Sequence, residues 1–357
     1  MPKNRIINYT PTFLFFGFFF VVNVVFASDN GLNIREVSSI GITNKKIKCS
    51  DHKFLVAGHI YGNFKNENSI YPSSSFLANV DYINQHSPSF LILLGDSYRL
   101  PLKDHVESFK RAIIESIESP IYSVIGNHES IDREIYSSIF KNTYFSFSHC
   151  NNTYIFLDSE ESDDSHFSDN QLDFLLNIGG SIGDSKNVFI FSHKLLWASK
   201  TNKYSPVWNS MNVRGKDADY DYYVDTIKPI IYKISEKYPT YFISGDIGLL
   251  SPKTVFYDKG DNITYIATGL GDRSDDNILS VSVSSDNIVG FNVVSLADNS
   301  TGDISFYDLN SWKVDTVEYN PDEFYRRFAV LILKILGVLV LGFFLGVWYK
   351  CKYLGKK

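Results

Sequence analysis

Apolar residues are concentrated in short, uninterrupted runs through the middle of the chain, and five of these runs end in the same way. They read FLVAG, FLILLG, YSVIG, NVFIFS and TYFISG, with almost no polar alternation. Such runs are typical of strands that are buried on both faces of a parallel sheet. Each is followed directly by a polar side chain of a type that binds metal ions: His59, Asp96, Asn127 (then His128), His193 and Asp246.

The position of these polar residues predicts one shared site. In an open α/β sheet the ligand site lies outside the carboxyl ends of the parallel strands. Five strands would therefore deliver imidazole, carboxylate and amide groups to one crevice. These groups are ligands for divalent cations such as Mn, Fe and Zn. The pattern thus predicts a metal site by position as well as by residue type.

The segments between and after the five runs complete the predicted fold. Helical candidates lie between the runs, around residues 75–85, 104–118, 169–177 and 221–237. After the fifth run, apolar and polar residues alternate, which predicts a terminal β-meander that completes the second sheet of a sandwich. Its strands would be 264–269, 278–285, 287–296 and 303–309. The expected class is an α/β fold of the α+β sandwich type, with two packed mixed β-sheets flanked by helices.

The ordered blocks resemble the signature of the calcineurin-like metallophosphoesterases. Gly95-Asp96-Ser97-Tyr98 is similar to the second block of that signature, Gly126-Asn127-His128-Glu129 matches the third in full, and Phe191-Ser192-His193 resembles the fourth. A Gly-Asp pair alone occurs by chance in most proteins, but Gly-Asn-His-Glu after a buried strand is specific. The resemblance covers residues 53–270 and includes the hairpin expected at 144–160.

The resemblance implies one metal site with a changed but complete ligand set. By position in the signature, its ligands would be Asp96, Asn127, His193 and Asp246. The resemblance also places His128 where it can assist the leaving oxygen, and imidazole suits general acid chemistry near neutral pH.

A second metal site, which would share Asp96, departs from the family pattern. The first block begins with His59 where the family has Asp, Tyr61 stands in place of a His, and Gly248 replaces the last His. His59 would therefore support the first ion or hold a weak second one. We expect one divalent ion of Mn, Fe or Zn, with two ions as the alternative.

These features predict a phosphoesterase that hydrolyses a phosphate mono- or diester of a small molecule, lipid or sugar. A single ion can still lower the pKa of a bound water and neutralise phosphate charge. The alternative is a catalytically impaired pseudo-phosphoesterase that is kept as a binding or assembly module. Taken singly, Asp96 and Asn127 could cap helices and His193 could be a core histidine, but five ordered blocks favour the metal site.

Both ends of the chain predict a membrane-associated, exported protein. Residues 1–27 resemble a signal peptide, with an uncleaved anchor as the alternative,. Residues 328–349 are long and apolar enough to span a bilayer, and the basic tail 350–357 favours the cytoplasmic side,. The phosphoesterase domain, expected at 50–312, would then lie on the extracytoplasmic side.

The remaining signals are weaker. Gly342 and Gly346 form a G-x-x-x-G pattern that would suit a homodimer in the membrane,. Export would allow a disulfide between Cys49 and Cys150. The net charge of −6 and the lack of a basic stripe outside the tail argue against a nucleic-acid backbone as partner,. Five histidines fit none of the blocks and are expected on the surface or in loops: His52, His86, His105, His149 and His166.

Overall fold

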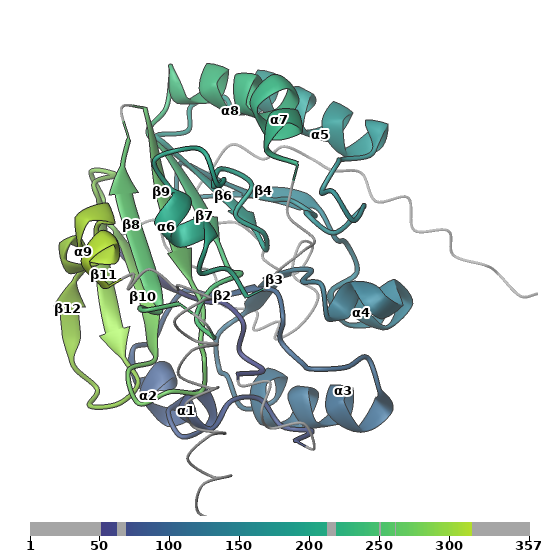
Figure 1. The fold of residues 1–357 in the computed structure, drawn as a ribbon, viewed down its shortest axis with the longest axis vertical. Helices are drawn as coiled ribbons and strands as arrows, with labels where there is room; N and C mark the ends of the chain where they lie inside the picture. Colours follow the sequence, from purple (N-terminus) through teal and green to yellow (C-terminus); the bar gives the residue numbers. More distant parts are fainter. Residues whose placement is uncertain (1–50, 63–68, 213–218, 250, 261, 316–357) are drawn as a thin grey trace, which may run out of the picture. The chain divides into compact units, whose positions relative to one another are not determined.

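The computed structural model describes residues 51–62, 69–212, 219–249, 251–260 and 262–315. Within these residues the chain forms two six-stranded sheets (Figure 1). The first has the order β12-β11-β10-β1-β2-β3, and the second has the order β4-β5-β6-β7-β9-β8. The first sheet comprises β1 (His52–Ala57), β2 (Leu91–Leu94), β3 (Ile121–Val124), β10 (Asn277–Val283), β11 (Val289–Ser295) and β12 (Thr301–Asp303). The second comprises β4 (Phe145–His149), β5 (Asn152–Phe156), β6 (Asn187–Ser192), β7 (Thr240–Ser244), β8 (Val255–Lys259) and β9 (Ile263–Thr268).

Both sheets are mixed, as the sequence predicted. Strands β1, β2 and β3 are parallel neighbours in the first sheet, and β5, β6, β7 and β9 are parallel neighbours in the second. The other pairings are antiparallel. The five apolar runs form β1, β2, β3, β6 and β7, so three of them belong to the first sheet and two to the second.

Three apolar layers explain why these runs lack polar alternation. Successive side chains of a strand point to opposite faces of the sheet. On β1, Phe54 and Val56 therefore pack into the layer between the two sheets, whereas Leu55 and Ala57 pack outward against helices. Both faces of the strand are covered by protein from Phe54 to Ala57, so these four positions are apolar.

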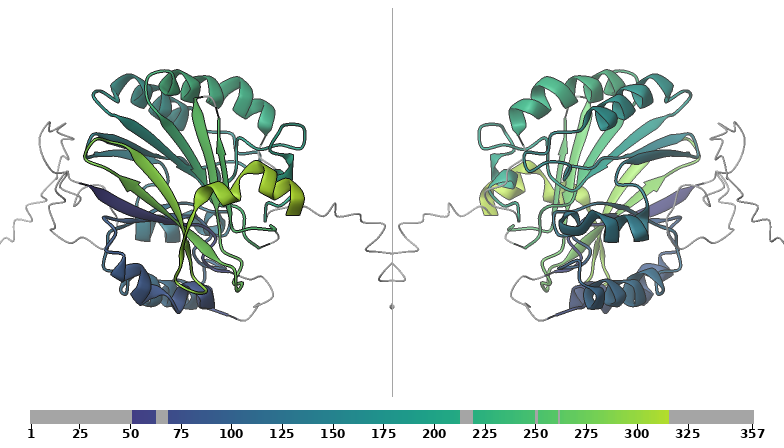
Figure 2. Two further views of the ribbon diagram at one scale, coloured as in Figure 1. Left: turned by 90° about the vertical axis from the view of Figure 1, so that its left-hand side faces the viewer. Right: turned by 90° about the vertical axis from the view of Figure 1, so that its right-hand side faces the viewer.

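Helices cover the outer faces of both sheets (Figure 2). Those packed on the first sheet are α1 (Ser74–Leu77), α2 (Val80–Gln85), α3 (Lys103–Phe109) with its π-helical continuation Lys110–Ile114, and α4 (Arg133–Phe140). Those packed on the second are α5 (Asp169–Ser181), α6 (Ser205–Trp208), α7 (Tyr220–Tyr222) with the π-helical turn Tyr223–Ile227, and α8 (Lys228–Ser235). Helix α9 (Leu309–Asp315) contacts β8 and buries Trp312.

The segments after the fifth run differ from the predicted single meander. The predicted strand at 264–269 corresponds to β9, which pairs within the second sheet, whereas β10, β11 and β12 extend the first sheet beside β1. Most of the last predicted strand is a 3-10 turn, Ile304–Tyr307. Side-chain alternation identifies a strand, but it carries no information about the sheet to which the strand is added.

None of the helices in the described ranges combines the length and the apolar character that a bilayer span requires. The predicted signal peptide at 1–27, the span at 328–349 and the tail at 350–357 all lie outside the described residues. The same holds for Cys49, Gly342 and Gly346.

Replacement of Phe90 by alanine should destabilise the packing between the two sheets. Phe90 is 1% exposed, and its ring lies 5.0 Å from that of Phe54 and 5.3 Å from that of Tyr154. We expect the free energy of unfolding, measured by urea titration of the purified protein, to fall by about 3–5 kcal/mol. Phe306→Ala is the control, because that ring is 72% exposed. Equal losses in the two variants would contradict the assigned core.

Candidate metal centre

The two sheets meet closely at the carboxyl ends of β1, β2 and β7. A Cβ atom on Gly58 would lie 2.9 Å from the Cα atom of Gly245, and one on Gly245 would lie 2.2 Å from the carbonyl oxygen of Leu94. Only glycine fits at such a backbone approach. The small residue at the end of these runs therefore lets polar residues from both sheets meet.

This approach brings five of the predicted residues together, and we call them the strand-end cluster: His59, Asp96, Asn127, His193 and Asp246. The Nε2 atom of His193 lies 3.0 Å from Asn127 Oδ1 and 3.6 Å from Asp96 Oδ1. The Nε2 atom of His59 lies 3.9 Å from the other carboxylate oxygen, Asp96 Oδ2. Asp96, His193 and Asp246 offer ligand atoms within 4.8 Å of one another.

Backbone carbonyl groups fix the orientation of both imidazoles. The Nδ1 atom of His193 lies 2.8 Å from the carbonyl oxygen of Leu94, and that of His59 lies 2.8 Å from the carbonyl oxygen of Leu270. Each Nδ1 therefore carries the proton and donates it, which leaves the lone pair on Nε2. Burial lowers the pKa of His59 to about 4 and also lowers the pKa of His193, so both rings are neutral at neutral pH.

The resulting set of atoms fits a bound cation. The lone pair of His193 Nε2 faces the carbonyl oxygen of Asn127, and both of these atoms lie beside the Asp96 carboxylate. Among the described residues, the buried Nε2 atom of His59 has no hydrogen-bond donor. Lone pairs of nitrogen and oxygen atoms that converge in this way are the arrangement that metal ligands adopt, and hydrogen-bonded Nδ1 atoms are typical of metal-binding histidines.

The positions that depart from the family pattern offer fewer ligand atoms. Gly248 has a φ of +116°, and a Cβ there would lie 2.2 Å from the carbonyl oxygen of Gly269. This backbone therefore leaves no room for a side chain. The ring of Tyr61 lies between those of His59 and His128, with centroid distances of 4.3 and 4.4 Å.

His128 lies at the border of the cluster. Its backbone N–H donates to Asp96 Oδ1 over 3.2 Å, and its Nδ1 atom donates to the carbonyl oxygen of Arg99. The side chain is partly exposed, unlike that of His193. His128 is thus held beside the cluster with Nε2 as its remaining ring nitrogen.

Glu129 holds this region together in a way that the sequence did not predict. Its buried carboxylate accepts the backbone N–H groups of Asp96 at 2.8 Å, Ser97 at 2.6 Å, Tyr98 at 3.3 Å and Gly126 at 2.9 Å. Burial and the neighbouring Asp96 raise the pKa of Glu129, while the N–H groups oppose that shift. The only feature of the sequence that points to this role is Glu129 itself, as the last residue of the Gly-Asn-His-Glu motif.

A buried ion pair next to His193 was also missed. Lys194 Nζ lies 3.3 Å from Glu160 Oε2, and the two side chains are only 3% and 5% exposed. Burial raises the pKa of Glu160 to about 8, although Lys194 opposes this shift. A single Lys and a single Glu 34 positions apart give no pattern that sequence reasoning could use.

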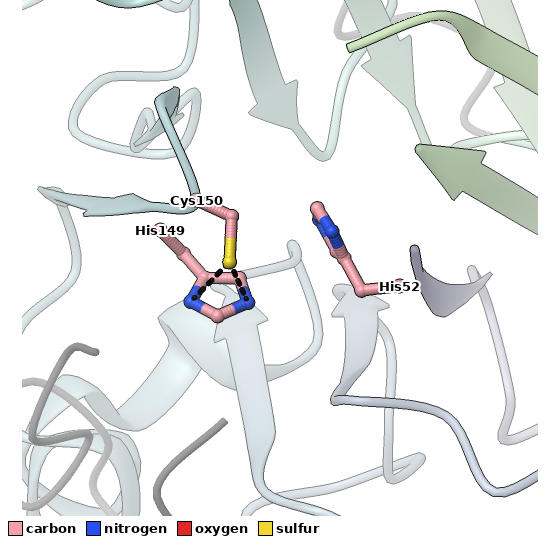
Figure 3. Close-up of side chains that lie close together, drawn as sticks. All are labelled: His52, His149 and Cys150. Atoms are coloured by element: carbon pink, nitrogen blue, oxygen red, sulfur yellow. Dashed lines mark hydrogen bonds between the residues drawn. The ribbon is translucent and has the colours of Figure 1, made fainter. Parts of the chain in front are cut away.

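A second group of ligand-type side chains lies at the start of β1 and the β4–β5 turn (Figure 3). The rings of His52 and His149 meet edge to face at 4.9 Å, and Cys150 Sγ lies 3.2 and 3.7 Å from the two ring nitrogens of His149. Because Cys150 Sγ lies at similar distances from both nitrogens of His149, it contacts the face of the ring and does not lie in line with the lone pair of either nitrogen. We therefore assign no metal to this group.

These contacts correct the prediction for the histidines outside the blocks. His52, His105 and His149 are 7%, 8% and 3% exposed, so they are buried and not surface residues. His52 Nε2 lies 3.2 Å from the Tyr154 hydroxyl group. The rings of His52 and His149 pack against each other, and that of His149 also packs against Phe90. The sequence shows no periodicity at these positions that would reveal this burial.

The fold and the cluster define a metallophosphoesterase-like α/β sandwich, and comparison with known proteins agrees. The sequence model of the calcineurin-like phosphoesterases matches residues 49–225. The chain belongs to this family. None of the curated protein sequences with which it was compared matches it.

One solved structure shows the same fold at low sequence identity. A purple acid phosphatase from yellow lupin (Lupinus luteus) seeds is 12% identical with a TM-score of 0.52, over 74% of this chain and 54% of the lupin chain. This chain thus spans about half the length of that protein. A dimetal phosphatase from Danio rerio is 13% identical with a TM-score of 0.46, over 70% of this chain and 98% of the other.

Replacement of Glu129 by glutamine should weaken metal binding without removing a ligand. The amide cannot accept all four N–H groups, so the Asp96 loop loses its fixed geometry. We expect the affinity for Mn, measured by chelator competition, to fall about 10- to 100-fold. Glu107→Gln is the matched control, because that side chain is 49% exposed on α3. Unchanged affinity in Glu129→Gln would show that the four hydrogen bonds do not position Asp96.

Proposed function

We propose that this protein hydrolyses a phosphate mono- or diester with one strongly bound divalent cation. The observation that carries the proposal is the convergence of acceptor atoms around Asp96. Each of its carboxylate oxygens faces the Nε2 atom of a neutral imidazole, His193 on one side and His59 on the other. Asn127 and Asp246 add an amide oxygen and a carboxylate to the His193 side.

The side chains would divide the work of hydrolysis between them. Asp96, Asn127, His193 and Asp246 would hold the cation, which supplies charge neutralisation and an activated water when bound. His59 would support this ion or hold a weaker second one. His128, whose Nδ1 is engaged by Arg99, would give a proton from Nε2 to the leaving oxygen,.

A binding or assembly module is the second candidate, and a specific observation favours it. The position of the last ligand in the family pattern is Gly248, where the backbone excludes any side chain. The clamp of two ions that phosphoesterases of this kind use would then be incomplete. Such a module would keep the fold and bind a phosphorylated ligand without turnover.

The location and partners of the protein are part of the proposal. The segments 1–27 and 328–357 support an exported domain tethered by one helix, with a homodimer through Gly342 and Gly346 as a further option,. A phosphorylated small molecule, lipid or sugar would be the substrate. A nucleic-acid backbone is not expected, because the net charge is negative.

Replacement of Asp96 by alanine should remove the bound metal. Asp96 is the carboxylate that both imidazoles face. Its loss therefore removes a ligand whether the cluster binds one ion or two. We expect metal content, measured by elemental analysis after dialysis, to fall from about one ion per chain to none. Asp104→Ala, at an exposed position in the first turn of α3, is the control. Unchanged metal content in Asp96→Ala would overturn the assignment.

Replacement of His128 by asparagine should leave the metal in place and slow turnover. The hydrolysis of an aryl phosphate and of an aryl phosphodiester would be followed with added Mn, Zn or Fe. Loss of a general acid should lower kcat about 100-fold or more. His166→Asn is the control, because that imidazole is exposed and pairs with Asp219. A wild-type protein that binds metal but hydrolyses neither ester would instead support the binding module.

A further inference from the structure

Tyr61 has a fixed position beside the strand-end cluster that the proposed ligand set does not use. Its backbone N–H donates to the carbonyl oxygen of Asp96 over 3.0 Å. Its ring is packed at tilted angles of 49° and 53° against the rings of His59 and His128. The side chain therefore separates the metal-binding imidazole from the imidazole proposed to assist the leaving group.

The phenol group is suited to contact a ligand of the cluster. Tyr61 is partly exposed, and no hydrogen bond from its hydroxyl group to the protein occurs among the described residues. Its ring contacts the ring of His59, whose Nε2 atom lies 3.9 Å from Asp96 Oδ2, so the side chain lies at the border of the strand-end cluster. Tyrosine is in any case a neutral O–H donor near neutral pH.

A phosphate group bound at the cluster would need such a donor. A phosphate ester carries negative charge on several oxygens, and one cation can neutralise only part of it. Gly248 provides no side chain that could hold a second ion in the usual place. The Tyr61 ring contacts the rings of both His59 and His128, so a phosphate bound between the cation and His128 would lie near this side chain.

We propose that the Tyr61 hydroxyl donates a hydrogen bond to a non-bridging phosphate oxygen of the substrate. This inference rests on the proposed function, because it assumes that a phosphate group binds at the strand-end cluster. Tyr61 is then a substrate-contacting residue and not a metal ligand. Its neutral hydrogen bond supplies part of the charge stabilisation that a second cation gives in a two-metal site.

The test is Tyr61→Phe in the full-length, Mn-loaded protein, a change that removes only the hydroxyl group. Hydrolysis of an aryl phosphate, metal content and the affinity for inorganic phosphate are measured together. We expect kcat to fall about 100-fold, as for the loss of one donor to a developing oxyanion, with metal content unchanged. Phosphate affinity should fall about tenfold, the loss of one hydrogen bond. Tyr71→Phe is the control, because that residue is 54% exposed.

The outcomes separate this inference from the proposed function. Unchanged kcat and unchanged phosphate affinity would overturn the phosphate contact. Loss of metal from Tyr61→Phe would make Tyr61 a ligand and would also overturn it. If the wild-type protein shows no turnover but Tyr61→Phe binds phosphate more weakly, the proposed hydrolysis is wrong and the phosphate contact is supported. If the wild-type protein neither hydrolyses the ester nor binds phosphate, both the proposed function and the phosphate contact are wrong.

Discussion

The geometry of the candidate site depends on one buried carboxylate. Glu129 accepts backbone N–H groups from the end of β2 and from Gly126 at the end of β3, so it fixes two strand ends at once. Asp96 has a φ of +55°, a conformation that a non-glycine residue adopts only when its surroundings hold it,. Because His59 and His193 are arranged around the two oxygens of Asp96, the placement of the cluster follows from this interaction.

The strands were predictable because both of their faces are buried, and such strands have uninterrupted apolar sequences. Runs such as FLILLG are too short for a typical buried helix and end in glycine, so they favour strands that are buried on both faces. The assignment of strands to sheets was less accessible. Strand β10 pairs with β1, more than 200 residues away, and such pairing depends on the whole packed structure and not on local pattern. The helix α4 was missed because its segment carries only a short amphipathic pattern after the Gly-Asn-His-Glu turn.

The residues of the candidate site were predicted better than their environment. Residue type and order indicated that Asp96, Asn127, His193 and Asp246 would meet, and the structure brings them together. The sequence could not show which nitrogen of each imidazole faces the cluster, because that depends on the carbonyl groups of Leu94 and Leu270. Partners that are distant in sequence and carry no motif, such as the Lys194–Glu160 pair, are visible only after folding.

The anchoring of the two imidazoles has a consequence for how this site changes over time. His193 follows a strand of the second sheet and donates to Leu94 of the first, whereas His59 follows a strand of the first sheet and donates to Leu270, which follows β9 of the second. Each histidine thus joins the two halves of the sandwich whether or not an ion is bound. A cation that binds only the folded chain would add to stability by mass action. Selection for a stable fold alone would then preserve these histidines, so their presence in a descendant is weak evidence that catalysis persists. Retention of a partly exposed side chain that does not join the two sheets, such as His128, is a stricter indicator.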